Sequence, residues 1–144
     1  EGAWAPTTLT WAVDNRTTAL RILAGSSKST RLETRVIGSD VNPYLAMAVT
    51  LKAGLEGIKQ RIQPPAPVNS NIYHMTERER KRLSIRALPG SLEEALQELL
   101  ADEVVQSALG EHILSRFIDA KKLEMDSYRT QVHQWELDQY LGVH

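Results

Sequence analysis

The segment from Ser29 to Gly38 carries three ionic side chains at alternate positions, Arg31, Glu33 and Arg35. Because successive side chains of a β-strand point to opposite faces, this spacing places all three on one face. An arginine fork holds phosphate or carboxylate by paired, charge-assisted hydrogen bonds, and a carboxylate suits Mg²⁺ or Mn²⁺. The row could hold a divalent cation against the oxygens of an anion. The same alternation is also typical of a solvated strand face with cross-strand ion pairs.

Further basic residues precede this row, at Arg16, Arg21 and Lys28, and within residues 14–39 only Asp14 and Glu33 oppose them. Lys28 lies in a loop of small residues, where backbone N–H groups could approach an anion. Basic groups around a single acid are what phosphoryl transfer requires, since its catalysis is mainly charge neutralisation and positioning.

Strand-like segments position these side chains in the first third of the chain. β-branched and apolar runs predict strands at Leu9–Val13 and Thr17–Leu23, and the ionic row continues a third strand from Arg31 to Ile37. Between the first two, Asp14-Asn15 suits a turn. We therefore expect an α+β fold of one domain, with a few antiparallel strands over residues 1–41 and a helical half over residues 42–144.

Cap signals predict where the helices begin and end. The expected starts are Asn42-Pro43, Thr76 with Glu79, Ser91 with Glu94, and Asp102. The first helix should place Leu55, Ile58 and Ile62 on one apolar face and end at an extended linker over Gln63–Asn71. Gly110 should end a further helix, before a last long helix from about Glu111 to Leu141.

Composition narrows the classes of function. With 17 Lys and Arg against 18 Asp and Glu, the net charge is −1, which gives no general attraction to nucleic acid or to an anionic membrane. No apolar run is long enough to span a bilayer, and there is no cysteine. The four histidines lack paired ligand spacing. We expect no nucleic-acid partner, no membrane association and a cytoplasmic location.

Four segments, in order, carry a resemblance to a known family: DNRTTALRI, RLETRVIGSDVNPYLAMAVTLKAGLEGI, PGSLEEALQEL and YRTQVHQWELDQYL. They resemble the C-terminal part of the glutamine synthetase catalytic domain. That family's pattern is an N-R-[ST] strand, a small-residue loop with Lys, R-x-E-x-R, N-P-Y-L and an Ala-rich helix containing A-G-L-x-G-I. The resemblance covers nearly the whole chain, which begins at Glu1 without Met, and implies a fragment that lacks the N-terminal domain and the first half of the catalytic domain.

The resemblance also implies which basic residues serve the nucleotide. Arg16, in the N-R-[ST] strand, resembles the arginine that stabilises the phosphoryl group during transfer. Arg21 resembles the next arginine for ATP phosphate. Lys28 and Arg31 match positions on the nucleotide side. All four would therefore face ATP.

By the same resemblance, Glu33 matches a carboxylate ligand of the metal that bridges ATP phosphate, Mg²⁺ or Mn²⁺, and Arg35 matches an arginine that holds glutamate. The implied function is a ligase of nitrogen metabolism. ATP phosphorylates the γ-carboxylate of glutamate, and ammonia or an organic amine displaces phosphate from the acyl phosphate. The parent is expected to form a homo-oligomeric ring, and the fragment alone to be inactive.

One position departs from the family pattern. Where glutamine synthetases usually carry an acid before "AP", which helps to bind and deprotonate ammonium and to close the site, this sequence has Trp4. Trp4 could line a pocket for an organic amine, such as an alkylamine or a polyamine, or simply pack while the acid comes from elsewhere. Loss of the acid also favours an alternative, a non-catalytic relative kept for structure or assembly, whereas the presence together of Arg16, Glu33 and Arg35 argues against it.

Overall fold

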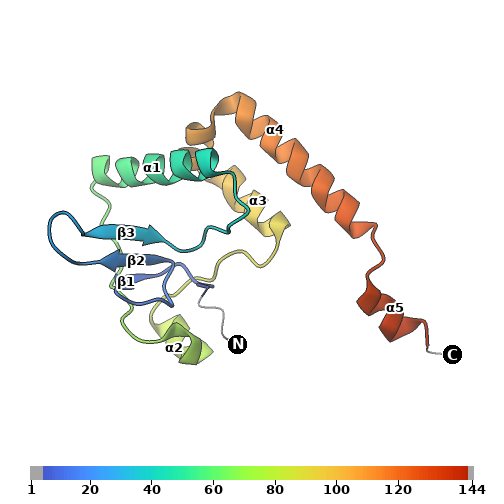
Figure 1. Cartoon of the computed structure of the whole chain (residues 1–144), viewed down its shortest axis with the longest axis horizontal. Coiled ribbons are helices and arrows are strands. Elements are labelled where there is room, and N and C mark those ends of the chain that lie inside the picture. Colours follow the sequence, from blue (N-terminus) through green and yellow to red (C-terminus); the bar gives the residue numbers. More distant parts are fainter. Residues whose placement is uncertain (1–4, 143–144) are drawn as a thin grey trace. The chain divides into compact units, whose positions relative to one another are not determined.

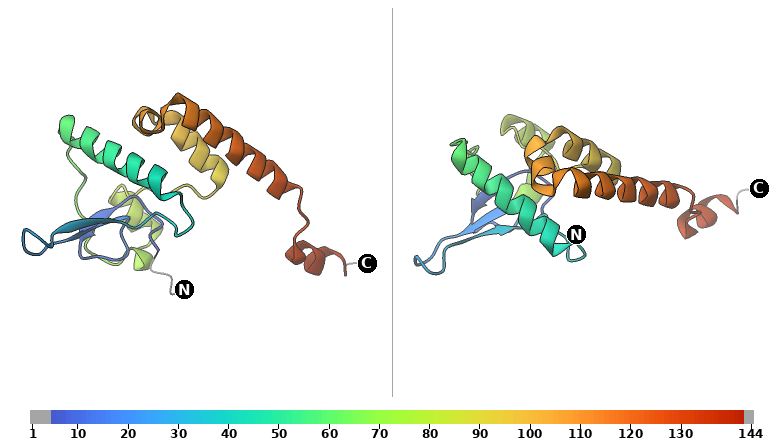
Figure 2. Two further views of the ribbon diagram at one scale, coloured as in Figure 1. Left: turned by 45° about the horizontal axis from the view of Figure 1, so that its top comes forward. Right: turned by 90° about the horizontal axis from the view of Figure 1, so that it is seen from above.

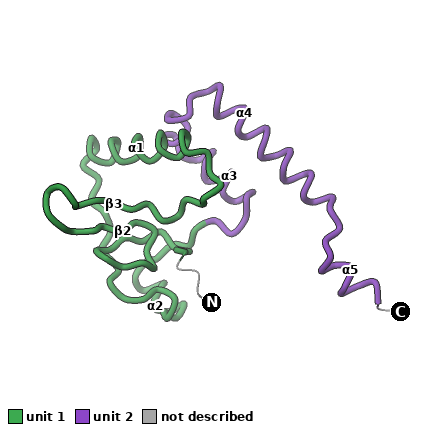
Figure 3. Tube along the Cα trace, in the orientation of Figure 1, with its two compact units in different colours: residues 1–88 green, residues 89–144 purple. Residues whose placement is uncertain are grey.

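The structure, a computed structural model, describes residues 5–142 of the chain and has three short strands followed by helices (Figure 1). In chain order the elements are β1 (Trp11–Val13), β2 (Leu20–Leu23), β3 (Arg31–Thr34), α1 (Pro43–Lys59), the 3-10 helix η1 (Ile72–His74), α2 (Glu77–Arg82), α3 (Leu92–Ala101), α4 (Glu103–Arg129) and α5 (Gln134–Tyr140). This order confirms the predicted α+β class. The chain divides into two compact units, one up to Leu88 and one from Pro89 on (Figure 3).

The three strands form one sheet in the order β1-β2-β3. Strands β2 and β3 pair antiparallel, as the sequence led us to expect, and their register places Arg21 opposite Glu33. Strands β1 and β2 instead pair parallel, with Ala12 opposite Arg21, so the expectation of antiparallel strands was wrong for this pair. Parallel neighbours usually need a crossover of a dozen or more residues. Here the chain returns through residues 14–19 alone.

Local hydrogen bonds explain how so short a segment reverses the chain and brings it back. Asp14 has a left-handed backbone, with φ of 55°, and its N–H donates to the carbonyl oxygen of Ile22 at 3.0 Å. The hydroxyl of Thr18 lies 2.9 Å from the carbonyl oxygens of both Asn15 and Leu20. Thr18 is fully buried. Residues 14–19 thus form a compact, internally hydrogen-bonded loop rather than the simple turn that the sequence indicated.

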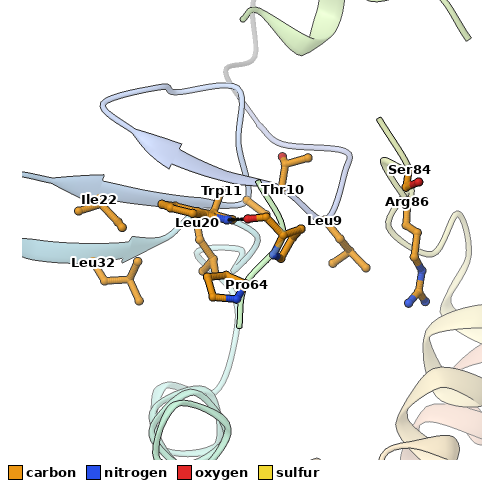
Figure 4. Close-up of a pocket in the computed structure, with 11 residues that line it drawn as sticks. Leu9, Thr10, Trp11, Leu20, Ile22, Leu32, Pro64, Ser84 and Arg86 are labelled. Atoms are coloured by element: carbon orange, nitrogen blue, oxygen red, sulfur yellow. Dashed lines mark hydrogen bonds between the residues drawn. The ribbon is translucent and has the colours of Figure 1, made fainter. Parts of the chain in front are cut away.

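Alternation divides the sheet into two chemically different faces. Arg21 and Glu33 share one face, while Leu20, Ile22 and Leu32 share the other. Figure 4 shows the apolar side chains around a pocket of about 590 Å³, closed on one side by the proline segment after α1. The indole Nε1 of Trp11 donates to the carbonyl oxygen of Pro65 at 2.7 Å, which ties that segment to the sheet.

Helix α1 lies on one side of the sheet in Figure 1 and crosses the strands obliquely when seen from above (Figure 2, right). Its predicted start is confirmed, because the Asn42 side-chain oxygen accepts hydrogen bonds from the N–H groups of Tyr44 and Leu45. A groove of about 540 Å³ lies between α1 and the end of β3. The described residues do not cover the apolar face predicted for this helix. No residue of α1 is buried, and Ile58 is 76% exposed.

The caps of the next two helices follow the sequence. Thr76 and Glu79 form a capping box at the start of α2, and the hydrogen bond from the Thr76 backbone is the main cause that lowers the pKa of Glu79. At the start of α3 the N–H of Glu94 donates to the Ser91 hydroxyl oxygen at 3.1 Å. These helices begin where the sequence predicts because each cap satisfies backbone groups that have no partner within the helix.

The second unit consists of α3, α4 and α5. Gly110 interrupts α4 with non-helical geometry, φ of 72° and ψ of 159°, which confirms the predicted break. The predicted continuous helix to Leu141 is wrong, because α4 ends at Arg129. The hydroxyl of Thr130 donates to the carbonyl oxygen of Ser127, and the carboxylate of Glu136 accepts from the N–H of His133, so that a new helix begins there.

No helix within residues 5–142 combines the length and the apolar composition that crossing a bilayer requires.

Candidate active site

The ionic face of the sheet brings the predicted acid to an arginine of the neighbouring strand. Nη1 of Arg21, on β2, donates to Oε2 of Glu33, on β3, at 3.2 Å. The two residues are opposite each other in the antiparallel register, so the contact follows directly from the strand pairing. The Arg21 side chain is only 11% exposed, and that of Glu33 is 31% exposed.

The other two arginines of the alternating row also face this acid. Nη2 of Arg31 lies 3.6 Å from Oε1 of Glu33, and Nη1 of Arg35 lies 3.9 Å from Oε2. Both distances describe ion pairs rather than hydrogen bonds. Three guanidinium groups therefore surround one carboxylate, and the three residues of the row are on the same side of the sheet.

A second carboxylate contacts Arg21 from the loop between β1 and β2. Nη2 of Arg21 donates to Oδ1 of Asp14, so Arg21 joins two acids through two different nitrogens. The hydrogen bond to Asp14 is the main cause that raises the pKa of Arg21 above its ordinary value, while burial opposes it. The Nε of Arg21 is buried and has no hydrogen-bond partner within residues 5–142.

Arg16 lies beside this network. Together with Arg21 and Asp14 it lines a polar hollow of about 530 Å³, which Asn69 and Asn71 also line. Arg16 is exposed and forms no ion pair within the described part of the chain. Two arginines that face one hollow form a suitable site for an anion.

Asn15 explains why the linker after α1 reaches the hollow. Its side-chain N–H₂ donates to the carbonyl oxygens of Val68 and Ser70, at 2.8 and 3.0 Å. Its oxygen accepts from the N–H and the hydroxyl of Thr17, at 2.9 and 2.8 Å. One side chain thereby fixes the linker against the loop that carries Arg16.

The remaining predicted residues contribute less to this geometry. Lys28 is exposed in the turn between β2 and β3, and the described residues place no acid within ion-pair distance of it. Trp4 lies outside the described residues. The structure thus brings Arg16, Arg21, Glu33, Arg31 and Arg35 to one side of the sheet and leaves Lys28 at the end of it.

The arrangement is compatible with a divalent cation at Glu33. Arg21 donates one hydrogen bond to this carboxylate, at Oε2, and lone pairs remain on both oxygens. Within residues 5–142, however, no three acids or histidines lie close enough to hold a metal. Glu33 fits as one oxygen ligand, and any others would have to come from outside the described residues.

Comparison with known proteins now identifies the family. The model of the glutamine synthetase catalytic domain matches residues 1–140. Curated glutamine synthetases are 48% identical in Thermus thermophilus, over 99% of this chain, and 48% identical in Thermotoga maritima, over 97% of it. The chain belongs to the glutamine synthetase family, and it spans about a third of the length of these relatives, 32% in each case.

Solved structures agree with this assignment. A structure described as apo GmaS without ligand superposes with a TM-score of 0.80 at 32% identity, covering 98% of this chain and 31% of that one. A cryoEM structure of Plasmodium falciparum glutamine synthetase gives a TM-score of 0.75 at 21% identity, covering 96% of this chain and 35% of that one, and supports the fold alone.

Sequence reasoning missed three residues of the hollow. The sequence indicates Asp14 as a turn residue and as a charge that opposes the arginines, but its contact with Arg21 depends on the unforeseen parallel pairing. Asn69 and Asn71 lie more than fifty positions after Arg16, in a segment that reads as a linker. The polar composition of that segment, after a run of prolines, was the available signal.

Proposed function

We propose that this chain is the C-terminal part of an ATP-dependent carboxylate–amine ligase of glutamine synthetase type. The enzyme would join ammonia or an organic amine to the γ-carboxylate of glutamate through an acyl phosphate. The observation that supports this most is the convergence of Arg21, Arg31 and Arg35 on Glu33, in a chain of this family. On a strand face that only contacts solvent, nothing would favour placing three arginines around one half-buried carboxylate, because their desolvation and mutual repulsion cost free energy.

Each side chain has a role that suits its chemistry and position. Arg16 and Arg21 would hold transferring phosphate at the polar hollow, because guanidinium forks pair with phosphate oxygens. Glu33 would be one ligand of Mg²⁺ or Mn²⁺, which when bound neutralises charge on ATP phosphate. Arg35, at the other end of the row, would bind the carboxylate of glutamate.

Three further assignments belong to the edges of the site. Arg31 and Lys28 would lie on the nucleotide side, where exposed cations can meet phosphate as it enters. Trp4 would line the amine pocket, in the position where glutamine synthetases usually carry an acid. A bulky apolar ring there favours an organic amine over ammonium.

The chain alone should be inactive, because it offers one metal carboxylate where such a site needs several. The sequence upstream of Glu1 should then contain further acids and a histidine for the metal. Product formed from ATP and glutamate by the isolated 144 residues would contradict this.

The deciding experiment uses the full-length protein that carries this chain. It is supplied with ATP, Mg²⁺ and glutamate and tested for phosphate release with ammonia, alkylamines and polyamines in parallel. We expect release that requires both glutamate and one of these amines. If no amine supports release, the protein is not a ligase of this type, and the non-catalytic alternative stands.

We also propose that the full-length protein assembles into a homo-oligomeric ring. The exposed apolar side chains of α1, among them Met47, Leu51 and Ile58, support burial against further protein. Light scattering should give a mass of several subunits, and a monomer at micromolar concentration would contradict the ring.

A further inference from the structure

Arg21 connects two carboxylates of different character. Its Nη1 donates to Glu33 and its Nη2 donates to Asp14, from a side chain that is 11% exposed. Glu33 is half-buried among arginines, whereas the Asp14 side chain is 70% exposed at the rim of the polar hollow. A guanidinium divided in this way cannot give both terminal nitrogens to either acid.

Backbone geometry holds Asp14 in place for this contact. Its φ of 55° is left-handed, a conformation that Asp and Asn adopt more readily than most other residues. Its N–H is fixed to the carbonyl oxygen of Ile22, one residue along β2 from Arg21. The carboxylate therefore reaches Arg21 from a backbone position that is hydrogen-bonded to β2.

We propose that Asp14 is a positioning residue that draws one nitrogen of Arg21 away from Glu33 and so keeps Glu33 available to a divalent cation. This inference rests on the proposed function, which assigns the cation to Glu33. Without Asp14, Arg21 could donate from both terminal nitrogens, Nη1 and Nη2, to Glu33 as a bidentate ion pair, the preferred geometry of arginine with carboxylate. A cation would then have to displace that pair before it could bind.

The test is direct titration of the full-length protein with Mn²⁺ in the absence of ATP. Electron paramagnetic resonance measures the concentration of free Mn²⁺ at each step of the titration. Asp14→Asn keeps the shape of the side chain and its tolerance of a left-handed backbone, and it removes only the charge. We expect Mn²⁺ affinity to fall about three- to fivefold, the size of effect for one partly exposed charged partner. Asp14→Gly, which also suits this φ, is a second variant if Asp14→Asn does not fold.

Repeating Asp14→Asn in an Arg21→Lys background tests how Asp14 acts. Lysine keeps the positive charge but cannot form a bidentate pair with a carboxylate. If Asp14 works through the arginine fork, its substitution should then change Mn²⁺ affinity by less than about 1.5-fold. An equal loss of affinity in both backgrounds would mean a simple field effect and would overturn the inference. No loss in the Arg21 background would overturn it as well.

Asp126→Asn is the matched control, because Asp126 is a similarly exposed aspartate beside an arginine, on α4. It should leave Mn²⁺ affinity unchanged. The two proposals can fail separately. A full-length protein that binds Mn²⁺ with the expected pattern but releases no phosphate refutes the ligase and keeps the role of Asp14. One that binds no Mn²⁺ refutes the role of Asp14.

Discussion

Charged side chains are arranged differently in the two compact units. In the first unit, Arg21 and Glu33 come from different strands, twelve residues apart, and two more arginines face the same acid. In the second unit, Lys121 pairs with Glu124 at 2.6 Å on one turn of α4, where both side chains remain accessible to solvent. One arrangement concentrates charge, and the other distributes it.

The difference shows which charges can carry a function. An exposed pair three residues apart on a helix contributes little to stability, since water and salt screen it. Surrounding one half-buried acid with three arginines has a cost in desolvation and in repulsion between the arginines. Such a cluster is better explained by a charged ligand than by stability. The four predictions that follow test this contrast, from the largest expected effect to the smallest.

Removing the acid at the centre of the cluster should have the largest effect. In the full-length protein, Glu33→Ala should abolish Mn²⁺ binding and nearly all turnover. The loss of the charged partner of Arg21, whose side chain is only 11% exposed, costs roughly 2–5 kcal/mol, or some two to three decades or more in rate. Phosphate release and Mn²⁺ titration measure this. Glu124→Ala, on the exposed turn of α4, is the control, and unchanged kinetics for Glu33→Ala would remove Glu33 from the site.

Removing the arginine at the end of the row should affect one substrate. Arg35→Ala should raise the KM for glutamate by about two decades, because a carboxylate loses its charged donor. The KM for ATP should change much less. Steady-state kinetics with each substrate varied in turn separates the two, and Arg129→Ala on α4 is the control. Equal effects on both KM values would argue against a specific role in glutamate binding.

A cap in the second unit should affect stability alone. Ser91→Ala removes the hydroxyl that accepts from Glu94 at the start of α3, which costs about 1 kcal/mol of helix stability. Hydrogen exchange of the α3 amides in the full-length protein should quicken about fivefold, while Mn²⁺ affinity stays the same. Ser115→Ala, on the exposed face of α4, should leave exchange of these amides unaltered. A loss of Mn²⁺ affinity in Ser91→Ala would contradict the separation of roles.

The smallest effect should come from the distributed charges. Lys121→Gln breaks the pair with Glu124 and should change the opening free energy of α4 by less than about 0.5 kcal/mol. Hydrogen exchange of the α4 amides measures this change. A loss above about 1 kcal/mol would show that this pair stabilises the helix far more than exposed pairs usually do.

Local signals predicted much of the fold. Asn42, Thr76 and Ser91 begin helices as expected, because capping depends on hydrogen bonds within a few residues. The antiparallel pairing of β2 with β3 and the shared face of Arg31, Glu33 and Arg35 also follow from short-range alternation. The resemblance to a known family, which rests on four motifs in the same order, supplied the expected roles of the site residues.

What could not be predicted depends on contacts between distant residues. The parallel pairing of β1 with β2 arises from hydrogen bonds inside residues 14–19 that alternation does not reveal. The contact between Asn15 and the linker joins residues more than fifty positions apart. The exposure of the apolar face of α1 could not be foreseen either, because apolar spacing shows which side of a helix is apolar but not whether the rest of the chain covers it.

The short length of the loop between β1 and β2 restricts how this protein can change over evolution. Residues within it can be exchanged as long as its hydrogen bonds persist. Its length cannot change freely, because a single insertion between Val13 and Leu20 would shift β2 by one position against β1. Such a shift would invert β2 and present Leu20 and Ile22 where the arginines and the acid now meet. Relatives should therefore differ here in side chains and almost never in residue number.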